Sequence, residues 1–328
     1  MIPYRTVFMH GLIYDESFHY LDHLAPFCAL MGWPLIALEP AVTERAYRYY
    51  PDLKVIDALP PLTPIVACEP RSLLRAALNA PDLQTFWLPH GNSDKGWKAP
   101  FFEALQESEP AFVYGEKMID FMREKKTLAK TIRVGNFRWA YFQKHKHFYT
   151  QTQIELGLPQ GRKNFLYAPT WDDSENNCSF WHAFPLLAEN LPESCNLIVK
   201  WHPNTYRLHE ARLERMIGQY ANRKNIVFIS DFPPIYPLLE ICDAYIGDMS
   251  SIGYDFLKFS RPMFFLNPQK RDAQTDRGLY LHRCGREIHP HQISSLFSLC
   301  DNREFTEIQR KTYDYTFDTD VTLPLVIS

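Results

Sequence analysis

The sequence predicts an α/β protein with two domains of similar size. Short apolar runs alternate with longer amphipathic segments along nearly all of the 328 residues, a pattern typical of parallel strands connected by helices. A polar stretch around Gly157, Pro159 and Gly161 interrupts the alternation. We therefore expect one domain over residues 1–155 and another over residues 156–328, facing each other across a cleft. The C-terminal helix could pack back on the first domain.

The first half contains short apolar runs bounded by polar residues, proline or glycine, which are typical of strands. Predicted strands are Thr6–Met9, Pro34–Leu38, Pro64–Cys68, Thr85–Leu88, Phe112–Tyr114 and Ile132–Val134. Helical spacing of apolar residues predicts helices over Phe18–Met31, Arg71–Asn79 and Lys117–Leu128.

The second half repeats this alternation. Predicted strands are Phe165–Tyr167, Asn196–Lys200, Ile226–Ile229, Ala244–Ile246 and Met263–Leu266, and predicted helices are Phe180–Asn190, Tyr206–Tyr220, Ile235–Ile241, Ser251–Lys258 and His291–Cys300. Open α/β sheets bind ligands beyond the carboxyl ends of their strands, so the polar residues directly after these strands are the site candidates.

Composition excludes several classes of function. A net charge of -3 provides no global field for nucleic-acid binding. No apolar run approaches the roughly 18–20 residues of a membrane span, and the first residues do not resemble a secretion signal, so we expect a cytoplasmic protein. Seven cysteines without a CxxC spacing favour neither a zinc site nor a disulfide framework.

A histidine follows one strand in the first half. His90 comes after Thr85–Leu88 and is followed by Gly91 and a polar turn that reaches Lys95. Such a histidine could act as a general base and take a proton from an attacking hydroxyl. The alternative is a loop histidine held by a backbone carbonyl. His10-Gly11 shows the same pattern, so the dipeptide alone specifies little.

Two polar clusters follow strands in the second half. Thr170 could donate to a phosphate, Trp171 offers a stacking face, and Asp172 could position a hydroxyl. The alternative for this cluster is a proline-fixed turn with an aspartate helix cap. The strand Asn196–Lys200 is predicted to deliver His202, fixed by Pro203, to the cleft.

A third cluster predicts an anion site. A buried strand ends near Gly247, and Ser250 and Ser251 then open a helix, so backbone N–H groups, the helix dipole and two hydroxyls could converge on a diphosphate. An ordinary serine N-cap is the alternative. Downstream, Arg277 could close over a phosphate or form a surface salt bridge.

Taken together and in this order, the motifs resemble the CDP-glycerol glycerophosphotransferase family, the teichoic-acid polymerases and primases of Gram-positive walls. The resemblance covers roughly residues 85–282. It is carried by His90-Gly91 with Lys95, Tyr167-Ala168-Pro169-Thr170-Trp171, His202-Pro203-Asn204, Asp248 with Ser250-Ser251 and Asp255, and Arg277-Gly278 with Tyr280. It implies the GT-B fold, in which two Rossmann-like domains face each other.

The resemblance also implies roles for these residues. His90 would act on the acceptor hydroxyl, while His202, Ser250 and Ser251 would bind or protonate the donor diphosphate with help from Arg277. Thr170 would contact the diphosphate, and Asp172, Asp248, Asp255 and Lys95 would support the site. Asp255 is either a structural helix residue or a ribose contact. The family usually has a proline between the glycine and the lysine of its first motif, where this chain has Asn92-Ser93-Asp94.

The implied reaction transfers glycerol phosphate, or a related polyol phosphate or sugar, from a CDP-linked or other nucleotide diphosphate donor. The acceptor would be a hydroxyl of a cell-envelope glycan or lipid-linked molecule, and neither a metal nor another cofactor is expected. The alternatives are a GT-B sugar transferase, an enzyme like UDP-GlcNAc 2-epimerase, and a non-catalytic nucleotide-sugar binding protein. The two histidines argue against the last, because binding alone would need only the serine cluster.

The segment 121–149 carries eight lysines and arginines against one acid, Glu124. Its second part could be a helix with Phe137, Tyr141, Phe142, Phe148 and Tyr149 on one side. Such a helix could contact the inner face of a membrane peripherally. The alternative, which we favour, is an inter-domain helix whose aromatic face packs in the core.

Overall fold

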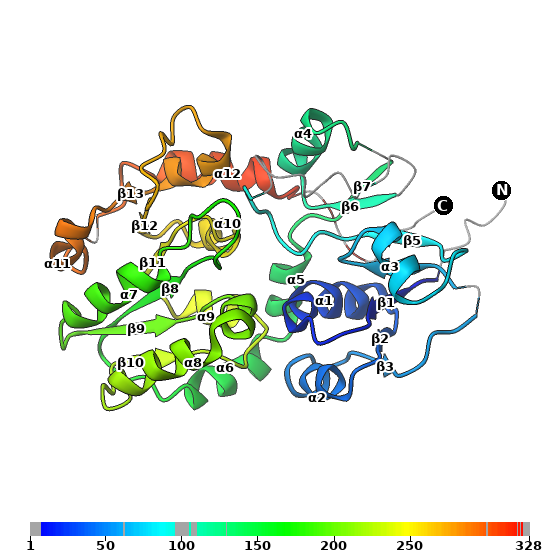
Figure 1. Cartoon of the computed structure of the whole chain (residues 1–328), viewed down its shortest axis with the longest axis horizontal. Coiled ribbons are helices and arrows are strands. Elements are labelled where there is room, and N and C mark those ends of the chain that lie inside the picture. The colour runs from blue at the N-terminus through cyan, green and yellow to red at the C-terminus, as the bar shows by residue number, and fades with distance from the viewer. Residues whose placement is uncertain are drawn as a thin grey trace. The chain divides into compact units, whose positions relative to one another are not determined.

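The computed structural model describes residues 8–61, 63–95, 105, 110–128, 130–299, 301–319, 321 and 323. It divides into two compact units, which we call unit 1 and unit 2. Unit 1 comprises residues 1–92, 100–148 and 314–328, and unit 2 comprises residues 93–99 and 149–313. Each unit contains its own sheet (Figure 1).

Unit 1 is a parallel Rossmann-like sheet. Among the described residues its seven strands run in the order β3-β2-β1-β4-β5-β6-β7, with every pair parallel. Their bounds are β1 His10–Ile13, β2 Leu35–Ala37, β3 Val55–Ile56, β4 Ile65–Ala67, β5 Thr85–Trp87, β6 Ala111–Val113 and β7 Thr131–Arg133. The order reverses between β1 and β4, the switch point at which such sheets bind ligands.

The helices of unit 1 pack an aromatic core. They are the 3-10 helix η1 (Phe18–Tyr20), α1 (Leu21–Met31), α2 (Pro40–Tyr49), α3 (Arg71–Ala77), α4 (Glu116–Glu124) and α5 (Phe137–Lys144), and α6 (Lys146–Glu155) crosses into unit 2. The ring of Phe27 in α1 lies 4.9 Å from Phe112 of β6 and 5.2 Å from Phe137 of α5. These rings are buried, and their burial stabilises unit 1.

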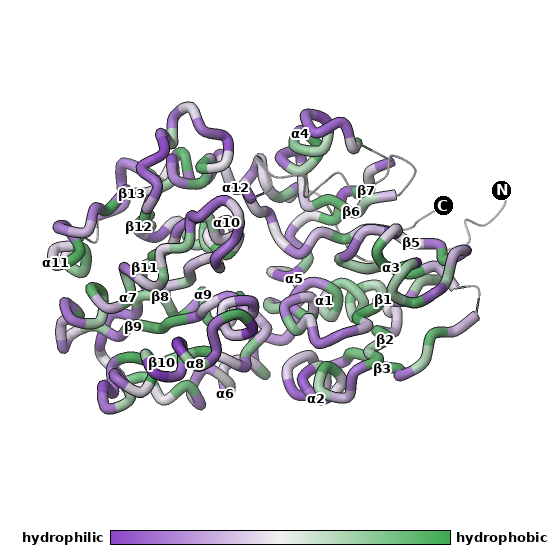
Figure 2. The backbone as a smooth tube through the Cα atoms, viewed as in Figure 1, coloured by the Kyte–Doolittle hydropathy of each residue, from purple (hydrophilic) through white to green (hydrophobic). Residues whose placement is uncertain are grey.

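Unit 2 repeats the architecture. Its described strands run in the order β10-β9-β8-β11-β12-β13, again all parallel. They are β8 Lys163–Ala168, β9 Cys195–Val199, β10 Ile226–Phe228, β11 Ala244–Gly247, β12 Met263–Phe265 and β13 Arg286–Glu287. The central strands of this sheet are hydrophobic in Figure 2. The two parallel sheets confirm the prediction of an α/β protein with two Rossmann-like domains.

The helical elements of unit 2 connect these strands. They are α7 (Phe180–Glu189), α8 (Pro203–Tyr220), α9 (Tyr236–Glu240), α10 (Ile252–Phe256), η3 (Leu257–Phe259), η4 (Arg277–Cys284), η5 (Pro290–Gln292) and α11 (Ile293–Leu296). The last helix, α12 (Thr306–Thr316), begins in unit 2 and ends in unit 1. Beyond it, the Asp318 amide donates to the Tyr114 carbonyl within unit 1 at 2.9 Å.

The first strand differs from its prediction. We expected Thr6–Met9, of which residues 6 and 7 lie outside the described residues, and the strand is His10–Ile13. His10 and Gly11 therefore belong to the strand and do not follow it. A Cβ at Gly11 would lie 2.5 Å from Cys28 Sγ and 2.9 Å from Leu35, so glycine allows close packing here. A glycine within a strand often marks such a close approach, and it need not end the strand.

Several elements were not predicted. The edge strands β3 and β13 have two residues each, too few to show a periodicity. Helix α2 does carry a readable pattern, because its buried residues Val42, Ala46 and Tyr49 recur at helical spacing. Its charged residues and Pro40 are equally typical of a connection, although proline is well tolerated in the first turn of a helix.

The second part of the basic segment 121–149 forms two helices, α5 and the start of α6, that meet at His145, and the first part contains the end of α4 and β7. Phe137, Tyr141, Phe142 and Tyr149 are buried, whereas Phe148 is exposed. Four of the five aromatic residues thus belong to the core, as the favoured alternative predicted. No described helix is both long enough and apolar enough to cross a membrane.

Candidate active site

Three loops of unit 2 meet at one edge of its sheet. Strands β9, β8 and β11 are neighbours, and they lead into the loops that contain His202, Thr170–Asp173 and Asp248–Ser251. Since the strands are parallel, their carboxyl ends lie on the same edge. Each of these candidate residues of unit 2 follows a strand, as expected.

Asp248 is the buried centre of this edge. Its carboxylate accepts hydrogen bonds from the Thr170 amide at 2.7 Å and from the amide and hydroxyl of Ser179, each at 2.8 Å. Burial raises the pKa of Asp248 to about 6, although these three donors and Lys95 favour the ionised form. Asp248 therefore holds the loop after β8 in place. Thr170 itself is 2% exposed.

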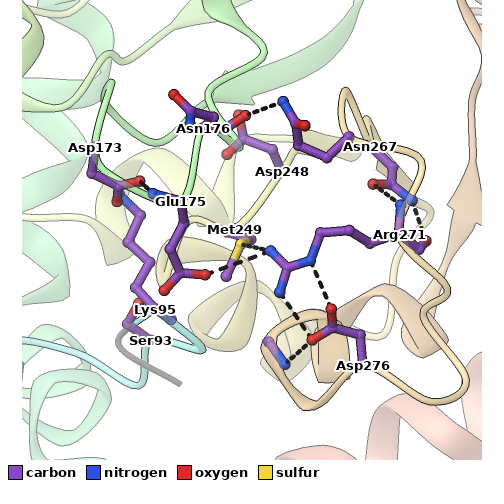
Figure 3. Close-up of polar contacts among 12 residues, drawn as sticks. Ser93, Lys95, Asp173, Glu175, Asn176, Asp248, Met249, Asn267, Arg271 and Asp276 are labelled. Atoms are coloured by element: carbon purple, nitrogen blue, oxygen red, sulfur yellow. Dashed lines mark hydrogen bonds and ion pairs between the residues drawn. The ribbon is translucent and has the colours of Figure 1, made fainter. Parts of the chain in front are cut away.

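The side chains of Lys95, Trp171 and His202 form a row at this edge of the sheet, with Trp171 between the other two. The Lys95 ammonium is 5.0 Å from the centre of the Trp171 ring and forms a salt bridge of 2.6 Å with Asp173. The rings of Trp171 and His202 are 6.0 Å apart. Figure 3 shows the Lys95–Asp173 contact. A cation, an aromatic face and an imidazole suit a nucleotide ligand.

The position of His202 determines which of its nitrogens carries a proton. His202 is the N-cap of α8, and its Nδ1 accepts a hydrogen bond from the Asn204 amide at 3.2 Å. In the neutral ring the proton is then on Nε2, which becomes the donor nitrogen. The backbone of α8 is non-helical at His209, so the helical segment that begins at Pro203 is short and an anion here would depend mainly on the Nε2 donor. This arrangement suits binding of an anionic group.

The carboxylate of Asp172 is occupied by contacts with other protein side chains. Its Oδ2 accepts from the Trp181 indole at 2.6 Å and lies 3.1 Å from His209 Nε2. The residue thereby ties the loop after β8 to α7 and α8. This geometry favours a structural role over the hydroxyl-positioning role that we predicted.

Ser250 and Ser251 are both half-exposed at the start of α10. Ser251 occupies the N-cap position, but its side chain makes no capping hydrogen bond with the described residues. The Ser250 hydroxyl interacts with Tyr245. Helix α10 has only five residues, so an anion here would depend on local N–H groups and hydroxyls more than on a helix dipole.

Arg277 begins η4, half-exposed, with its guanidinium carbon 6.0 Å from the centre of the Tyr280 ring. A neighbouring arginine, Arg271, was not predicted. It binds Asp276 through two hydrogen bonds of 2.7 and 2.9 Å and lies 3.5 Å from Glu175 (Figure 3). Arg271 thus connects the loops after β8 and β12.

This arginine explains the glycine in the Arg277-Gly278 motif. A Cβ at Gly278 would lie 2.5 Å from Arg271 Nη2. Asp276, the N-cap of η4, accepts from the Gly278 amide as well as from Arg271. The glycine therefore makes room for the guanidinium that aligns the start of η4.

Asp255 is a buried structural residue. It is 2% exposed and accepts a hydrogen bond from the Tyr236 hydroxyl at 3.1 Å. Of the two alternatives for this residue, the geometry favours the helix role over a ribose contact.

His90 belongs to unit 1 and follows β5. Its half-buried ring lies 5.2 Å from Tyr20 and 5.5 Å from His19. Gly91 has a φ of 121°, which L side chains rarely adopt, so the backbone requires glycine after this histidine. The Tyr114 hydroxyl donates to the Pro89 carbonyl at 3.0 Å and fixes the preceding residue.

Sequence reasoning also missed two buried amides. Asn92 and Asn177 are each 1% exposed, and neither amide atom of either side chain has a hydrogen-bond partner among the described residues. Such groups cost stability, and each lies in a loop that carries predicted site residues. Only burial distinguishes them from ordinary loop asparagines.

Two Rossmann-like units, each built on a parallel sheet, are the architecture of the GT-B class. Residues 138–305 match the model of the family described as CDP-Glycerol:Poly(glycerophosphate) glycerophosphotransferase. The chain belongs to this family, as the resemblance predicted.

Curated relatives include the teichoic acid ribitol-phosphate polymerase TarL of Staphylococcus aureus, 29% identical over 133 residues. A teichoic acid ribitol-phosphate primase of Bacillus spizizenii is 27% identical over 165 residues. These matches cover 40% and 48% of this chain, but only 23% and 39% of the relatives.

Two solved structures show the same fold. The wall teichoic acid polymerase TagF has a TM-score of 0.63 at 15% identity, over 95% of this chain and 85% of that chain. UDP-GlcNAc 2-epimerase from Neisseria meningitidis has a TM-score of 0.60 at 12% identity, over 94% of this chain and 95% of that chain.

Proposed function

We propose that this protein is a transferase that moves a polyol phosphate, most simply glycerol phosphate from CDP-glycerol, to a hydroxyl of a cell-envelope acceptor. One observation carries the proposal. The family match over residues 138–305 contains every donor-side candidate of unit 2 except Lys95, and Thr170, His202 and Ser250-Ser251 follow the carboxyl ends of neighbouring strands. A nucleotide diphosphate is the ligand that their chemistry fits.

On this proposal, unit 2 binds the donor. His202 donates from Nε2 to a diphosphate oxygen, and Ser250, Ser251 and Arg277 contribute further donors. Trp171 and Lys95 would lie against the nucleotide. The buried Asp248 and Arg271 would act by holding the loops, because both are already engaged by protein groups. Charge-assisted hydrogen bonds of this kind stabilise negative charge as it grows on the leaving phosphate.

The proposed reaction is a displacement at phosphorus. The acceptor oxygen forms a bond to the distal phosphorus of the donor, and its proton passes to His90. The bond from that phosphorus to the bridging oxygen breaks, and the electron pair leaves with the nucleoside monophosphate. Alignment and charge neutralisation are the main contributions that a protein can make to such a step.

The remaining proposals concern partners and location. That the reaction needs no metal stays a prediction. Assays with and without a chelator would test it. Cytoplasmic location and peripheral membrane contact through residues 121–149 also stay predictions. For that contact the exposed Lys144 and Lys146 are the relevant groups, since most of the aromatic residues are buried.

The experiment is an incubation with CDP-glycerol, CDP-ribitol or UDP-GlcNAc, each with and without a lipid-linked glycerol phosphate acceptor. Release of CMP that depends on the acceptor supports the proposal. Isomerisation of UDP-GlcNAc without acceptor would instead support an epimerase. Acceptor-dependent release of UDP would support a sugar transferase. Binding without any turnover would support a non-catalytic nucleotide-sugar binding protein.

A further inference from the structure

Three neighbouring strands of unit 1 deliver polar side chains to one edge. In the order β1-β4-β5, Tyr14 directly follows β1, Glu69 comes two residues after β4, and His90 comes three residues after β5. This edge includes the point between β1 and β4 at which the strand order reverses. Ligands of open α/β sheets bind at such a point.

Tyr20 of η1 connects two of these residues. Its ring lies 5.2 Å from the His90 ring, and its hydroxyl donates to Glu69 Oε1 at 3.4 Å. The Tyr14 hydroxyl interacts with the same carboxyl group. Glu69, Tyr20 and His90 are therefore contiguous.

The Glu69 carboxyl is incompletely satisfied. Its Oε2 is shielded from solvent and has no hydrogen-bond partner in the described part of the chain. Burial is the largest influence and raises the pKa of Glu69; the nearby Asp15 raises it further, while the Tyr14 and Tyr20 hydroxyls lower it. A buried carboxylate oxygen without a donor, connected through Tyr20 to a candidate general base, is typical of a ligand site.

The negative charge around Glu69 indicates which kind of ligand could bind there. A carboxylate only accepts hydrogen bonds, so it needs a donor. Asp15 adds a second negative charge, and no lysine or arginine of the described residues is among the groups that act on the Glu69 carboxyl. A phosphate here would be repelled. An uncharged group with hydroxyls would supply the missing donor.

We propose that Glu69, oriented by Tyr20 and Tyr14, binds an uncharged terminal diol of the acceptor, holding one hydroxyl while the adjacent hydroxyl lies at His90. The inference rests on the proposed function and assigns its acceptor subsite. Glu69 binds and orients the diol, and the proton of the attacking hydroxyl still passes to His90.

The test uses two probes, an alkyl-linked glycerol phosphate oligomer that ends in a free 1,2-diol and the same oligomer without the terminal hydroxyl. Calorimetry measures the affinity of each probe for wild type, Glu69→Gln and Tyr20→Phe. Glu16→Gln is the control, because Glu16 is an exposed carboxylate in the loop between β1 and η1, the loop that also contains Tyr14. CDP-glycerol is titrated into all four proteins.

We expect wild type and Glu16→Gln to prefer the diol probe about tenfold, the scale of a hydrogen bond to a charged group. Glu69→Gln should lose this preference, Tyr20→Phe should reduce it, and CDP-glycerol affinity should not change. Retention of the full preference by both variants would overturn the inference, as would equal binding of the two probes by wild type. Neither result decides the proposed function, which would fail separately if wild type did not bind CDP-glycerol.

Discussion

The hydroxyl of Tyr254 lies 2.7 Å from both carboxylate oxygens of Asp94. Asp94 is only four residues after His90, yet the segment that contains it belongs to unit 2. The Leu281 amide also donates to Asp94, at 3.2 Å. Unit 2 therefore anchors the chain directly beside Lys95, and Asp94 and Tyr254 act as positioning residues for that lysine.

We expect Tyr254→Phe to weaken CDP-glycerol binding about threefold to tenfold and to lower the free energy of unfolding by about 1–3 kcal/mol, since a buried carboxylate loses a donor. Calorimetry and urea unfolding measure the two effects. The control is Tyr206→Phe, which removes a 2.6 Å hydrogen bond to Glu210 on the exposed face of α8. Equal effects of the two substitutions would contradict the anchoring role.

The contributions of Asp248 and His282 to the free energy of unfolding should depend on pH in opposite directions. The folded-state pKa of Asp248 is raised to about 6, mainly by burial, so its contribution to stability falls as pH rises from about 4 to 6. Burial also lowers the pKa of His282 to about 4, so its contribution rises with pH between about 4 and 6.5. His282 Nε2 lies 3.3 Å from the Asp248 carbonyl oxygen.

Urea unfolding between pH 4 and 7 can separate these two contributions. Asp248→Asn should make stability rise more steeply with pH than in wild type, and His282→Gln should make it fall. Each contribution is about 3 kcal/mol across its window, at roughly 1.4 kcal/mol per pKa unit. Parallel pH profiles for all three proteins would show that neither group titrates as described.

Gly278→Ala tests the role of Arg271. The new methyl group would displace the guanidinium from Asp276, so we expect lower stability and at least a severalfold loss of CDP-glycerol affinity. The control is Gly218→Ala in α8, where an added Cβ would have no described neighbour within 4 Å. That change should raise stability by about 0.5–1 kcal/mol because alanine favours helix. Unchanged donor affinity in Gly278→Ala would refute a link between Arg271 and the site.

The sequence predicts the strands of both sheets well, apart from the two-residue edge strands and a shift of the first strand. Continuous apolar runs such as Leu35–Ala37 and Leu197–Val199 reflect burial on both faces of a parallel sheet, which is a local signal. The placement of Thr170, His202 and Ser250 after adjacent strands follows from the same pattern. The motif order then indicates the family.

Pairings between distant residues could not be predicted in this way. Asp172 looks like a site carboxylate, but it binds Trp181 and His209, and nothing in the sequence indicates those contacts. Arg271 and Glu69 are similarly unremarkable in sequence. Each becomes significant only through burial and through partners on another loop, which depend on tertiary packing.

The central claim is that His202 binds the donor diphosphate whereas His90 serves the acceptor. Calorimetric titration of CDP-glycerol into wild type, His202→Ala and His90→Ala tests it most directly. We predict a loss of at least tenfold in affinity for His202→Ala, the scale of a charge-assisted hydrogen bond, and wild-type affinity for His90→Ala. Wild-type affinity in both variants would contradict the account.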